Sequence, residues 1–375
     1  MEWEKFKRTY AREGIVLVLG AGVSLCSGIP RWENLIRGMV TDSFGGDAEI
    51  FDQLRAKMMS FTAMASLLEE RTLAGRKAFV EQVRKALYGT FPFYPDGVDE
   101  GNYTQLVNYI EKGTDGIHVG IPNHTLHSVG AFCTVWKDPV KGESGYNINP
   151  KVHAVVTLNM DALLQSYINA MTKRRLLRTV ERPSVRLYPD RINIYHIHGY
   201  LHFDTRNEDP SRDKPINGKQ ARDAPEAVVL TEQDYYNFYN NPNSLFNYTF
   251  LYLLREYSCL FIGLSMEDEN IRRLLHYSKM ERMHSLEKQK GRPVESITDP
   301  QERARYIEKL REECSRHVAI LERSENSEVD QAQEATLHPL GVSVLRVKPD
   351  FSDLPKKLGS LYKAADRDGW AKVFK

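Results

Sequence analysis

The chain of 375 residues has few cysteines, and none of them has a partner nearby in the sequence. They stand singly at Cys26, Cys133, Cys259 and Cys314. A zinc site of the ribbon type needs paired cysteines, so no zinc is expected. Cys259 lies in the apolar run 259–262, where a buried, reduced thiol is the ordinary role of a cysteine.

An excess of charge and long apolar runs are also missing. The 51 Lys and Arg side chains nearly balance the 50 Asp and Glu side chains, which leaves a formal net charge of +1. This balance gives no reason to expect direct nucleic-acid binding or a membrane as partner. The basic residues 173–175 and Arg178 are interpreted as the solvated face of a helix. Because the N-terminus is charged and no stretch is long enough to span a bilayer, a cytoplasmic location is predicted.

Short apolar runs of strand length alternate with helical segments along the chain. The strands are expected at 15–19, 153–158, 192–197, 228–230, 258–262, 318–321 and 342–345. This alternation predicts an α/β fold with a Rossmann-like, doubly wound parallel sheet.

The segment 41–129 has helical periodicity and no strand run, so it is predicted to be a helical insertion or subdomain after the first βα unit. Residues 1–40 and 130–375 then form the α/β domain. We also expect a loop at 204–225, an exposed helix at 300–314, and a helix that begins with a capping box of Thr231 and Asp234.

A glycine-rich turn directly follows the first apolar run. Its polar and small residues are Gly20, Ala21, Gly22, Ser24 and Ser27. Glycine tolerates positive φ and lets the backbone approach a ligand, and the amides at the start of a helix bind phosphate. Pro30 suits the first turn of the helix that follows. The turn 20–30 is therefore predicted to hold the pyrophosphate of a dinucleotide.

Three later strand ends also carry polar residues. They are Asn159 and Asp161, then His196 and His198, then Gly263, Ser265 and Asp268. Ligands of open α/β sheets bind at the carboxyl ends of strands, although the same residues can also cap the next helix. Residues two apart on a strand share a face, but a pair of histidines without a third ligand is no metal site. His198 is therefore interpreted as a general base that faces the ligand crevice.

As a set, the four motifs resemble those of the sirtuin-like NAD-binding family. They read GAGVSLCSGIPRW at 20–32, TLNMD at 157–161, HIHG at 196–199 and GLSMEDENI at 263–271. The resemblance implies that the first motif holds the NAD pyrophosphate, that Asn159 contacts the nicotinamide ribose, and that His198 is the catalytic base. It also implies that Gly263 and Ser265 lie near the adenosine. The expected NAD-binding set is completed by Ser27, Ile29, Trp32, Thr157 and Asp268.

Two departures separate the chain from sirtuin deacylases. Their zinc ribbon is missing after His198, and Arg31-Trp32 stands where they have Asp-Phe-Arg. The motif at 263–271 and the segment LTEQDY at 230–235 instead resemble a bacterial sirtuin-like branch of antiphage defence that hydrolyses NAD. A free-standing chain of this size resembles the subunit that partners a HerA-like ATPase. A homo-oligomer built on helices of 41–129 is also expected.

The resulting hypothesis is an NAD glycohydrolase that releases nicotinamide and ADP-ribose. Asn159 would orient the ribose hydroxyls or the attacking water, His198 would accept a proton, and Asp161 would orient Asn159 or the ribose. No acidic residue ends a strand about 20 residues beyond the glycines, so NAD is interpreted as substrate rather than hydride carrier. The alternatives are an NAD-dependent protein deacylase or ADP-ribosyltransferase, and a non-catalytic subunit that binds NAD or ADP-ribose.

Overall fold

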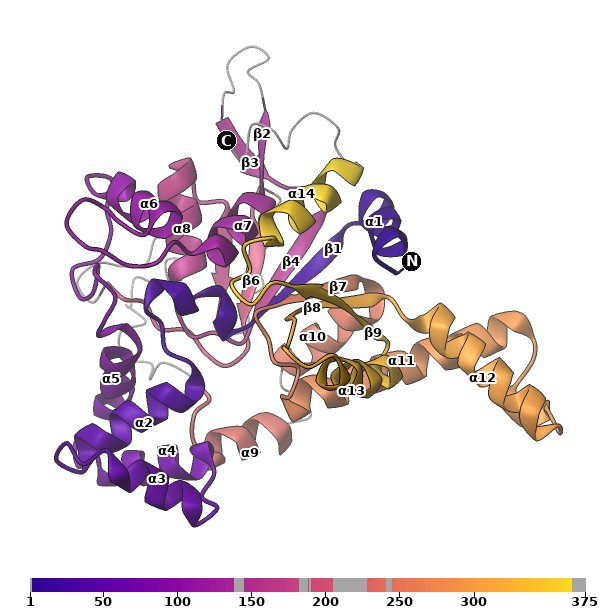
Figure 1. Cartoon of the computed structure of the whole chain (residues 1–375), viewed down its shortest axis with the longest axis horizontal. Coiled ribbons are helices and arrows are strands. Elements are labelled where there is room, and N and C mark those ends of the chain that lie inside the picture. Colours follow the sequence, from indigo (N-terminus) through magenta and orange to yellow (C-terminus); the bar gives the residue numbers. More distant parts are fainter. Residues whose placement is uncertain are drawn as a thin grey trace.

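The computed structural model describes residues 2–137, 145–181, 188, 190–204, 228–240 and 245–365, and within them one large sheet forms the centre of the molecule (Figure 1). It has seven strands in the order β5-β6-β4-β1-β7-β8-β9, and all neighbouring pairs are parallel. Helices cover both of its faces, so the predicted Rossmann-like, doubly wound α/β fold is confirmed.

The strands of this sheet are β1 (Ile15–Leu19), β4 (Val152–Thr157), β5 (Leu177–Val180), β6 (Ile192–His196), β7 (Ser258–Ile262), β8 (His317–Glu322) and β9 (Val342–Val347). A separate hairpin consists of β2 (Thr134–Lys137) and β3 (Gly145–Ile148).

The described α-helices are α1 (Glu2–Glu13), α2 (Trp32–Ser43), α3 (Glu49–Ala56), α4 (Phe61–Arg71), α5 (Gly75–Tyr88), α6 (Tyr103–Lys112), α7 (His124–Phe132), α8 (Leu163–Thr172), α9 (Glu232–Asn240), α10 (Leu245–Glu256), α11 (Glu269–Lys290), α12 (Pro300–Cys314), α13 (Ser327–Leu337) and α14 (Leu354–Ala365). Short 3-10 helices are η1 (Ala21–Val23), η2 (Leu25–Ser27), η4 (Val294–Ser296) and η5 (His338–Leu340).

β1 is the central strand, and its side chains alternate between two hydrophobic layers. Leu17 and its alternate neighbours pack in the layer that includes side chains of α1, α7, α8 and α14. Val16 and Val18 pack in the other layer, against α10, α11 and α13. Every residue of β1 is buried, which explains its unbroken aliphatic sequence.

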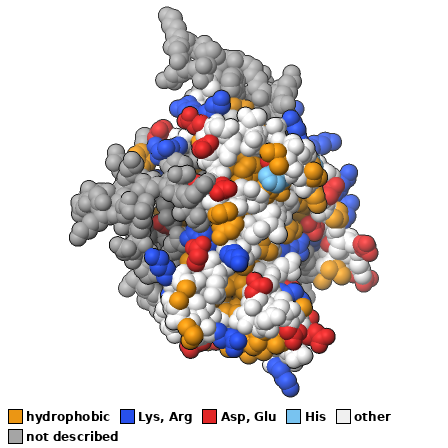
Figure 2. Space-filling view, turned by 90° about the vertical axis from the view of Figure 1, so that its left-hand side faces the viewer, with side chains coloured by type: hydrophobic (Ala, Val, Ile, Leu, Met, Phe, Trp, Pro, Cys, Tyr) orange, Lys and Arg blue, Asp and Glu red, His pale blue; other side chains and the backbone are white. Residues whose placement is uncertain are grey.

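The helical segment 41–129 shares the core of the sheet. Buried side chains of this segment, such as Phe51, Phe79 and Leu106, belong to the same hydrophobic cluster as Leu17. The same segment also exposes large apolar side chains at Met58, Leu73, Ile117, Val119 and Ile121. Figure 2 shows the face of the molecule on which this helical region lies, where hydrophobic side chains stand among charged ones. The division into an α/β domain and a helical subdomain stays a prediction.

Tyr88, the last residue of α5, links the helical region to two strand ends. Its fully buried hydroxyl accepts a hydrogen bond from the Ala162 amide at 2.8 Å and donates to the Leu201 carbonyl at 2.7 Å. Leu201 N in turn donates to Met160 O at 2.7 Å. The chain beyond β4 is therefore tied to the chain beyond β6.

Several local predictions are confirmed. Thr231 and Asp234 form the capping box, since Asp234 N donates to Thr231 Oγ1 at 3.2 Å and Thr231 N donates to Asp234 Oδ2 at 2.9 Å. The mostly exposed helix α12 has the predicted bounds, and with α11 it projects from the body of the molecule (Figure 1). No described helix combines the length and apolarity needed to cross a membrane.

Other local predictions are wrong. Residues 228–230 are not a strand, and Val229 N donates to His198 O in the turn beyond β6 rather than to a sheet strand. Arg178 is buried in β5 rather than on a solvated helix face, since the chain turns after α8 and re-enters the sheet. Pro30 precedes α2 by two residues instead of standing in its first turn. The expected loop 204–225 lies, apart from Asp204, outside the described residues.

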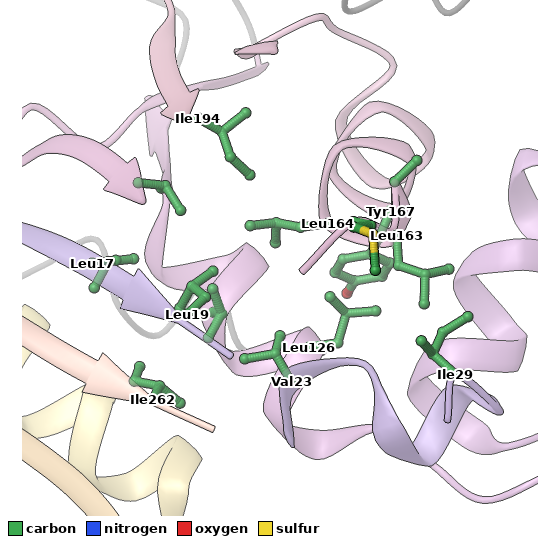
Figure 3. Packing of buried hydrophobic residues seen from close by; sticks show 14 of the residues in the cluster. Leu17, Leu19, Val23, Ile29, Leu126, Leu163, Leu164, Tyr167, Ile194 and Ile262 are labelled. Carbon is green, nitrogen blue, oxygen red and sulfur yellow. The ribbon is translucent and has the colours of Figure 1, made fainter. Parts of the chain in front are cut away.

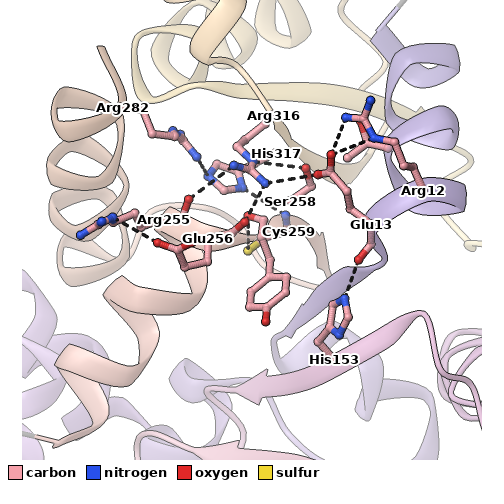
Figure 4. Close-up of polar contacts among 12 residues, drawn as sticks. Arg12, Glu13, His153, Arg255, Glu256, Ser258, Cys259, Arg282, Arg316 and His317 are labelled. Atoms are coloured by element: carbon pink, nitrogen blue, oxygen red, sulfur yellow. Dashed lines mark hydrogen bonds and ion pairs between the residues drawn. The ribbon is translucent and has the colours of Figure 1, made fainter. Parts of the chain in front are cut away.

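Polar contacts of Arg282, Arg316 and His317 hold the amino-terminal edge of the sheet (Figure 4). Arg282 Nη1 donates to the Leu254 carbonyl at 3.1 Å, and Arg316 Nη2 donates to the Glu256 carbonyl at 2.8 Å, so both arginines cap the end of α10. His317 Nδ1 accepts from Cys259 N at 3.1 Å. Burial lowers the pKa of His317 well below its usual value and raises the pKa of the Cys259 thiol to about 12, so both stay neutral.

Replacing Tyr88 by phenylalanine should destabilise the fold. The variant keeps the ring but leaves the Ala162 amide and the Leu201 carbonyl without their buried partner, which costs roughly 1–3 kcal/mol. Urea denaturation measures the change. Tyr94→Phe is the matched control, because Tyr94 stacks on Tyr88 with ring centroids 6.0 Å apart and its hydroxyl bonds no described residue. Equal stability of the two variants would contradict the role of the Tyr88 hydroxyl.

Candidate active site

The four motifs meet at the carboxyl ends of four adjacent strands. The turns follow β6, β4, β1 and β7, which are neighbours in that order. After β1 the chain adds β4, β5 and β6 on one side of β1. It then crosses over and adds β7, β8 and β9 on the other side. The gap between β1 and β7 is therefore the topological switch point, where open α/β sheets bind their ligands.

At this point the glycine-rich turn lies directly on the turn after β7. Gly22 N donates to Gly263 O at 3.0 Å, and Gly20 N donates to Ile262 O at 3.0 Å. A Cβ atom on Gly22 would lie 2.8 Å from the Gly263 Cα, which is too close for any side chain. Glycine is therefore required at positions 20 and 22 because the backbone of the turn after β7 leaves no room for a side chain there.

The backbone of this turn differs from the prediction. Gly20 is extended with φ −127°, and positive φ occurs at Gly28 (88°) and Gly263 (71°) rather than at Gly20 or Gly22. The turn continues as η1 and η2, and the first α-helix, α2, begins only at Trp32. The prediction that an α-helix, with its dipole, directly follows the glycines is thus wrong. The close contact of Gly22 with Gly263 favours the tighter 3-10 turns instead. Trp32 is half-buried at the start of α2.

Asn123, a residue not predicted from the sequence, connects the start of α7 to the glycine-rich turn. Its buried Nδ2 donates to the Val23 carbonyl at 2.9 Å and to Ser27 Oγ at 2.8 Å, while its Oδ1 caps α7 at the Leu126 amide. An Asn before a helix is a readable N-cap signal, but its second role depends on the fold. Ser27 therefore helps to hold the turn.

The apolar side of the turn is part of the core (Figure 3). Val23 and Ile29 are buried in the cluster that also contains Leu126 of α7 and Leu163 of α8. Ile29 thus anchors the turn on the helices beneath it.

Asn159 is held by three different strand ends. Its amide N–H donates to Thr157 Oγ1 at 3.0 Å, its carbonyl accepts from His196 Nδ1 at 2.9 Å, and its Nδ2 donates to Gly20 O at 3.0 Å. Thr157 is the buried last residue of β4. The Oδ1 atom of Asn159 bonds no described residue. It can therefore accept a hydrogen bond from a hydroxyl group.

Asp161 is a buried acid beneath the glycine-rich turn. Its carboxylate accepts from Leu163 N at 3.0 Å and from the hydroxyl of Ser24. Burial raises its pKa from 3.8 to about 6, and these hydrogen bonds oppose the rise. A carboxyl that is still ionised near neutral pH despite burial fixes Ser24 at the turn.

The two histidines have separate surroundings, because β6 ends at His196 and the alternation of a strand does not reach His198. His196 bonds Gln165 and Asn159 on the α8 side. The ring of His198 packs at 5.8 Å against Tyr235 of α9. Burial lowers the pKa of His198 below its usual value, and the charge of Asp268 opposes this shift. A neutral imidazole is the form that a general base requires.

The turn after β7 combines unusual backbone with a helix cap. Gly263 and the buried Met266 both have positive φ, at 71° and 63°. Asp268 Oδ1 accepts from Ile271 N at 2.8 Å and caps α11. Capping of the next helix is one of the two roles expected for the polar residues at the strand ends. Ser265 is exposed beyond the glycine contact.

A small chamber of about 10 Å³ lies beneath the turns, lined among others by Ser24, Asn159, Asp161, Gln165 and His196. Its size suits about one water molecule and is too small for an aromatic ring. A larger cleft of about 450 Å³ lies between α4 and α9, and its Glu69, Glu70 and Glu232 disfavour a pyrophosphate. Among the residues described, no three His, Cys, Asp or Glu side chains are grouped to hold a metal.

Comparison with models of known protein families identifies a relationship. The family model described as SIR2-like domain matches residues 153–344, which are 192 of the 375 residues. The match includes β4, β6 and β7 with Asn159, His198 and Gly263, whereas β1 and its glycine-rich turn precede it. A search of curated proteins finds no match.

Adding a methyl group at Gly22 should disrupt the site. The Gly22→Ala Cβ must displace the Gly263 backbone, so we expect a loss of roughly 1–3 kcal/mol in the free energy of unfolding. Gly38→Ala is the control, because Gly38 lies exposed within α2 with no atom within 4 Å of the added Cβ. That variant should gain about 0.5–1 kcal/mol. Chemical denaturation of both proteins decides, and an unchanged Gly22→Ala stability would contradict the packing argument.

Neutralising Asp161 should stabilise the protein above pH 6. The folded pKa of about 6 exceeds the unfolded value of 3.8, so the folded state binds more protons and stability falls as pH rises through this window. Asp161→Asn removes this loss, which is on the order of 3 kcal/mol at pH 8. Urea denaturation at pH 4.5 and at pH 8 should show a larger gain at pH 8. A gain that does not depend on pH would contradict a buried ionised carboxylate.

Proposed function

This chain belongs to the SIR2-like domain family, and from that premise we propose that it is an NAD hydrolase. Membership implies NAD-related activity in general. The proposed reaction cleaves the bond between nicotinamide and ribose and releases nicotinamide and ADP-ribose. NAD is then the substrate, and the residues described above would bind it and assist its hydrolysis.

One observation carries this proposal: Asn159 and His198 leave adjacent parallel strands at the same level. Thr157 of β4 pairs with His196 of β6, so each of the two candidate residues stands two positions beyond a paired residue. Asn159 is also bonded to Gly20 of the glycine-rich turn. An amide, a neutral imidazole and the glycine-rich turn are thus brought to one edge of the sheet.

The chemistry requires little more than these groups. As the nicotinamide bond breaks, the ribose gains the character of an oxocarbenium ion, and nicotinamide leaves as a neutral molecule. A water oxygen forms the new bond to the anomeric carbon and loses a proton, which His198 accepts. Asn159 Oδ1 orients a ribose hydroxyl or this water. General-base assistance contributes about 10²–10⁴-fold to such a rate.

Asp161 supports this arrangement as a positioning residue. It bonds Ser24 and the first amide of α8, so it connects the glycine-rich turn to the segment that carries Asn159. The remaining residues of the proposed NAD-binding set are Gly20, Ala21, Gly22, Ser27, Ile29, Trp32, Thr157, Gly263, Ser265 and Asp268. In this set Ser265 has the most open position, which suits contact with the adenosine part.

The proposed role of the activity is NAD depletion in antiphage defence, together with a HerA-like ATPase. The support is the resemblance of the motif at 263–271 and the segment 230–235 to that bacterial branch. A homo-oligomer is proposed as well, and the exposed apolar side chains of the helical region, such as Ile117 and Val119, support it. The alternative of NAD-dependent protein deacylation is disfavoured by the sequence departures at Arg31-Trp32 and after His198.

Removing either proposed catalytic side chain should abolish NAD cleavage. Asn159→Ala and His198→Ala are expected to lower nicotinamide release by at least roughly 10²-fold while the protein stays folded. Nicotinamide is measured by chromatography after incubation with NAD, for the chain alone and with a HerA-like ATPase. Because the pKa of His198 is lowered, the rate of the wild type should persist below pH 6.5 and fall only at more acidic pH.

Exposed residues of the same types serve as controls, namely Asn237→Ala on α9 and His276→Ala on α11. Full turnover in both site variants would refute the assignment. Nicotinamide release that depends on an acylated peptide would identify a deacylase. Binding of NAD without any turnover would identify a binding subunit.

A further inference from the structure

His196 joins the ends of two neighbouring strands through a defined hydrogen bond. It is the last residue of β6 and is 1% exposed. Its Nδ1 lies 2.9 Å from the Asn159 carbonyl oxygen. Because a carbonyl oxygen only accepts, Nδ1 must carry the proton and donate it.

This protonation state determines the contact on the other side of the ring. A neutral imidazole that is protonated at Nδ1 has an accepting lone pair at Nε2. Gln165 Nε2 lies 2.6 Å from that atom and donates to it. Gln165 Nε2 also donates to Thr179 Oγ1 at 3.3 Å. The hydrogen bonds therefore run from β5 through α8 and β6 to Asn159.

The orientation of Gln165 has an energetic cost. Its Oε1 is buried and has no partner among the described residues, which costs about 1–3 kcal/mol. Turning the amide over would place that oxygen against the lone pair of His196 Nε2, so the present orientation is the one that keeps the contact. Buried polar groups are rarely left unpaired without a reason, and here the reason is the contact with His196.

We propose that His196 and Gln165 are positioning residues that set the backbone of Asn159 for cleavage of NAD. This inference rests on the proposed function of the same site. His196 holds the carbonyl of Asn159 while Thr157 holds its amide, so the peptide group on each side is fixed. The Asn159 side chain then reaches Gly20 with its Nδ2 and presents Oδ1 to the substrate.

A matched pair of variants separates positioning from packing. Asparagine places its amide nitrogen where Nδ1 of histidine lies, so His196→Asn keeps the donor to Asn159. Glutamine places its amide nitrogen where Nε2 lies, so His196→Gln loses that donor and keeps a similar volume. We expect kcat to fall about 10²-fold in His196→Gln with little change in KM, since a displaced catalytic group costs about that much. In His196→Asn, kcat should stay within about threefold of the wild type.

Gln165→Leu provides a second test of the same chain of contacts. It removes the donor to His196 Nε2 while Asn159 still accepts from Nδ1, so its kcat should fall less than that of His196→Gln. Equal losses of kcat in His196→Asn and His196→Gln would overturn the proposal, because they would indicate packing alone. Unchanged kcat in His196→Gln would overturn it as well.

A readout without turnover distinguishes this proposal from the proposed function. In full-length protein labelled with ¹⁵N at histidine, the His196 ring should show protonated Nδ1 and unprotonated Nε2. The backbone amide of Met160, which shares a peptide group with the Asn159 carbonyl, should shift in His196→Gln and stay near its wild-type position in His196→Asn. If the wild type cleaves no NAD, these signals still test the hydrogen bonds that connect Gln165, His196 and Asn159. A ring protonated at Nε2 alone would refute it.

Discussion

The contact between the backbones of Gly22 and Gly263 is the constraint on which the candidate site depends. It joins the turns after β1 and β7 at the switch point of the sheet, with one hydrogen bond of 3.0 Å and no room for a side chain. This contact directs the chain into two 3-10 turns instead of an α-helix. It also places Gly20 O where Asn159 can bond it. The two halves of the sheet thus meet where the ligand is proposed to bind.

The helical region supports this edge from below. Asn123 holds the glycine-rich turn at Val23 and Ser27, and Tyr88 ties the chain beyond β4 to the chain beyond β6. Both residues belong to the segment 41–129, whose buried side chains share the core with β1. A change in the packing of these helices would therefore move both the glycine-rich turn and the chain beyond β4.

Both edges of the sheet contain buried polar groups. At the amino-terminal edge, Arg282, Arg316 and His317 satisfy the carbonyls and amides where α10 ends and β7 begins. At the carboxyl-terminal edge, Asp161 keeps a carboxylate in the interior with its pKa raised to about 6, and Gln165 leaves an oxygen unpaired. Arg282 Nε and Nη2 are likewise buried without a partner among the described residues, so both edges contain polar groups whose burial costs stability.

The sequence by itself determined the class of fold and the edge of the sheet at which its four motifs lie, because both depend on local patterns. Aliphatic runs of strand length, as at 15–19, predict a buried parallel strand, and the polar residues that follow such runs must lie at one edge of the sheet. The tertiary structure decided what each residue contacts. Gly22 packs against the backbone of Gly263, 241 positions away in the chain, and Asn123 bonds a turn 100 residues before it. His196 and His198 have different surroundings because β6 ends at His196. Such contacts join residues distant in sequence, so no local pattern predicts them.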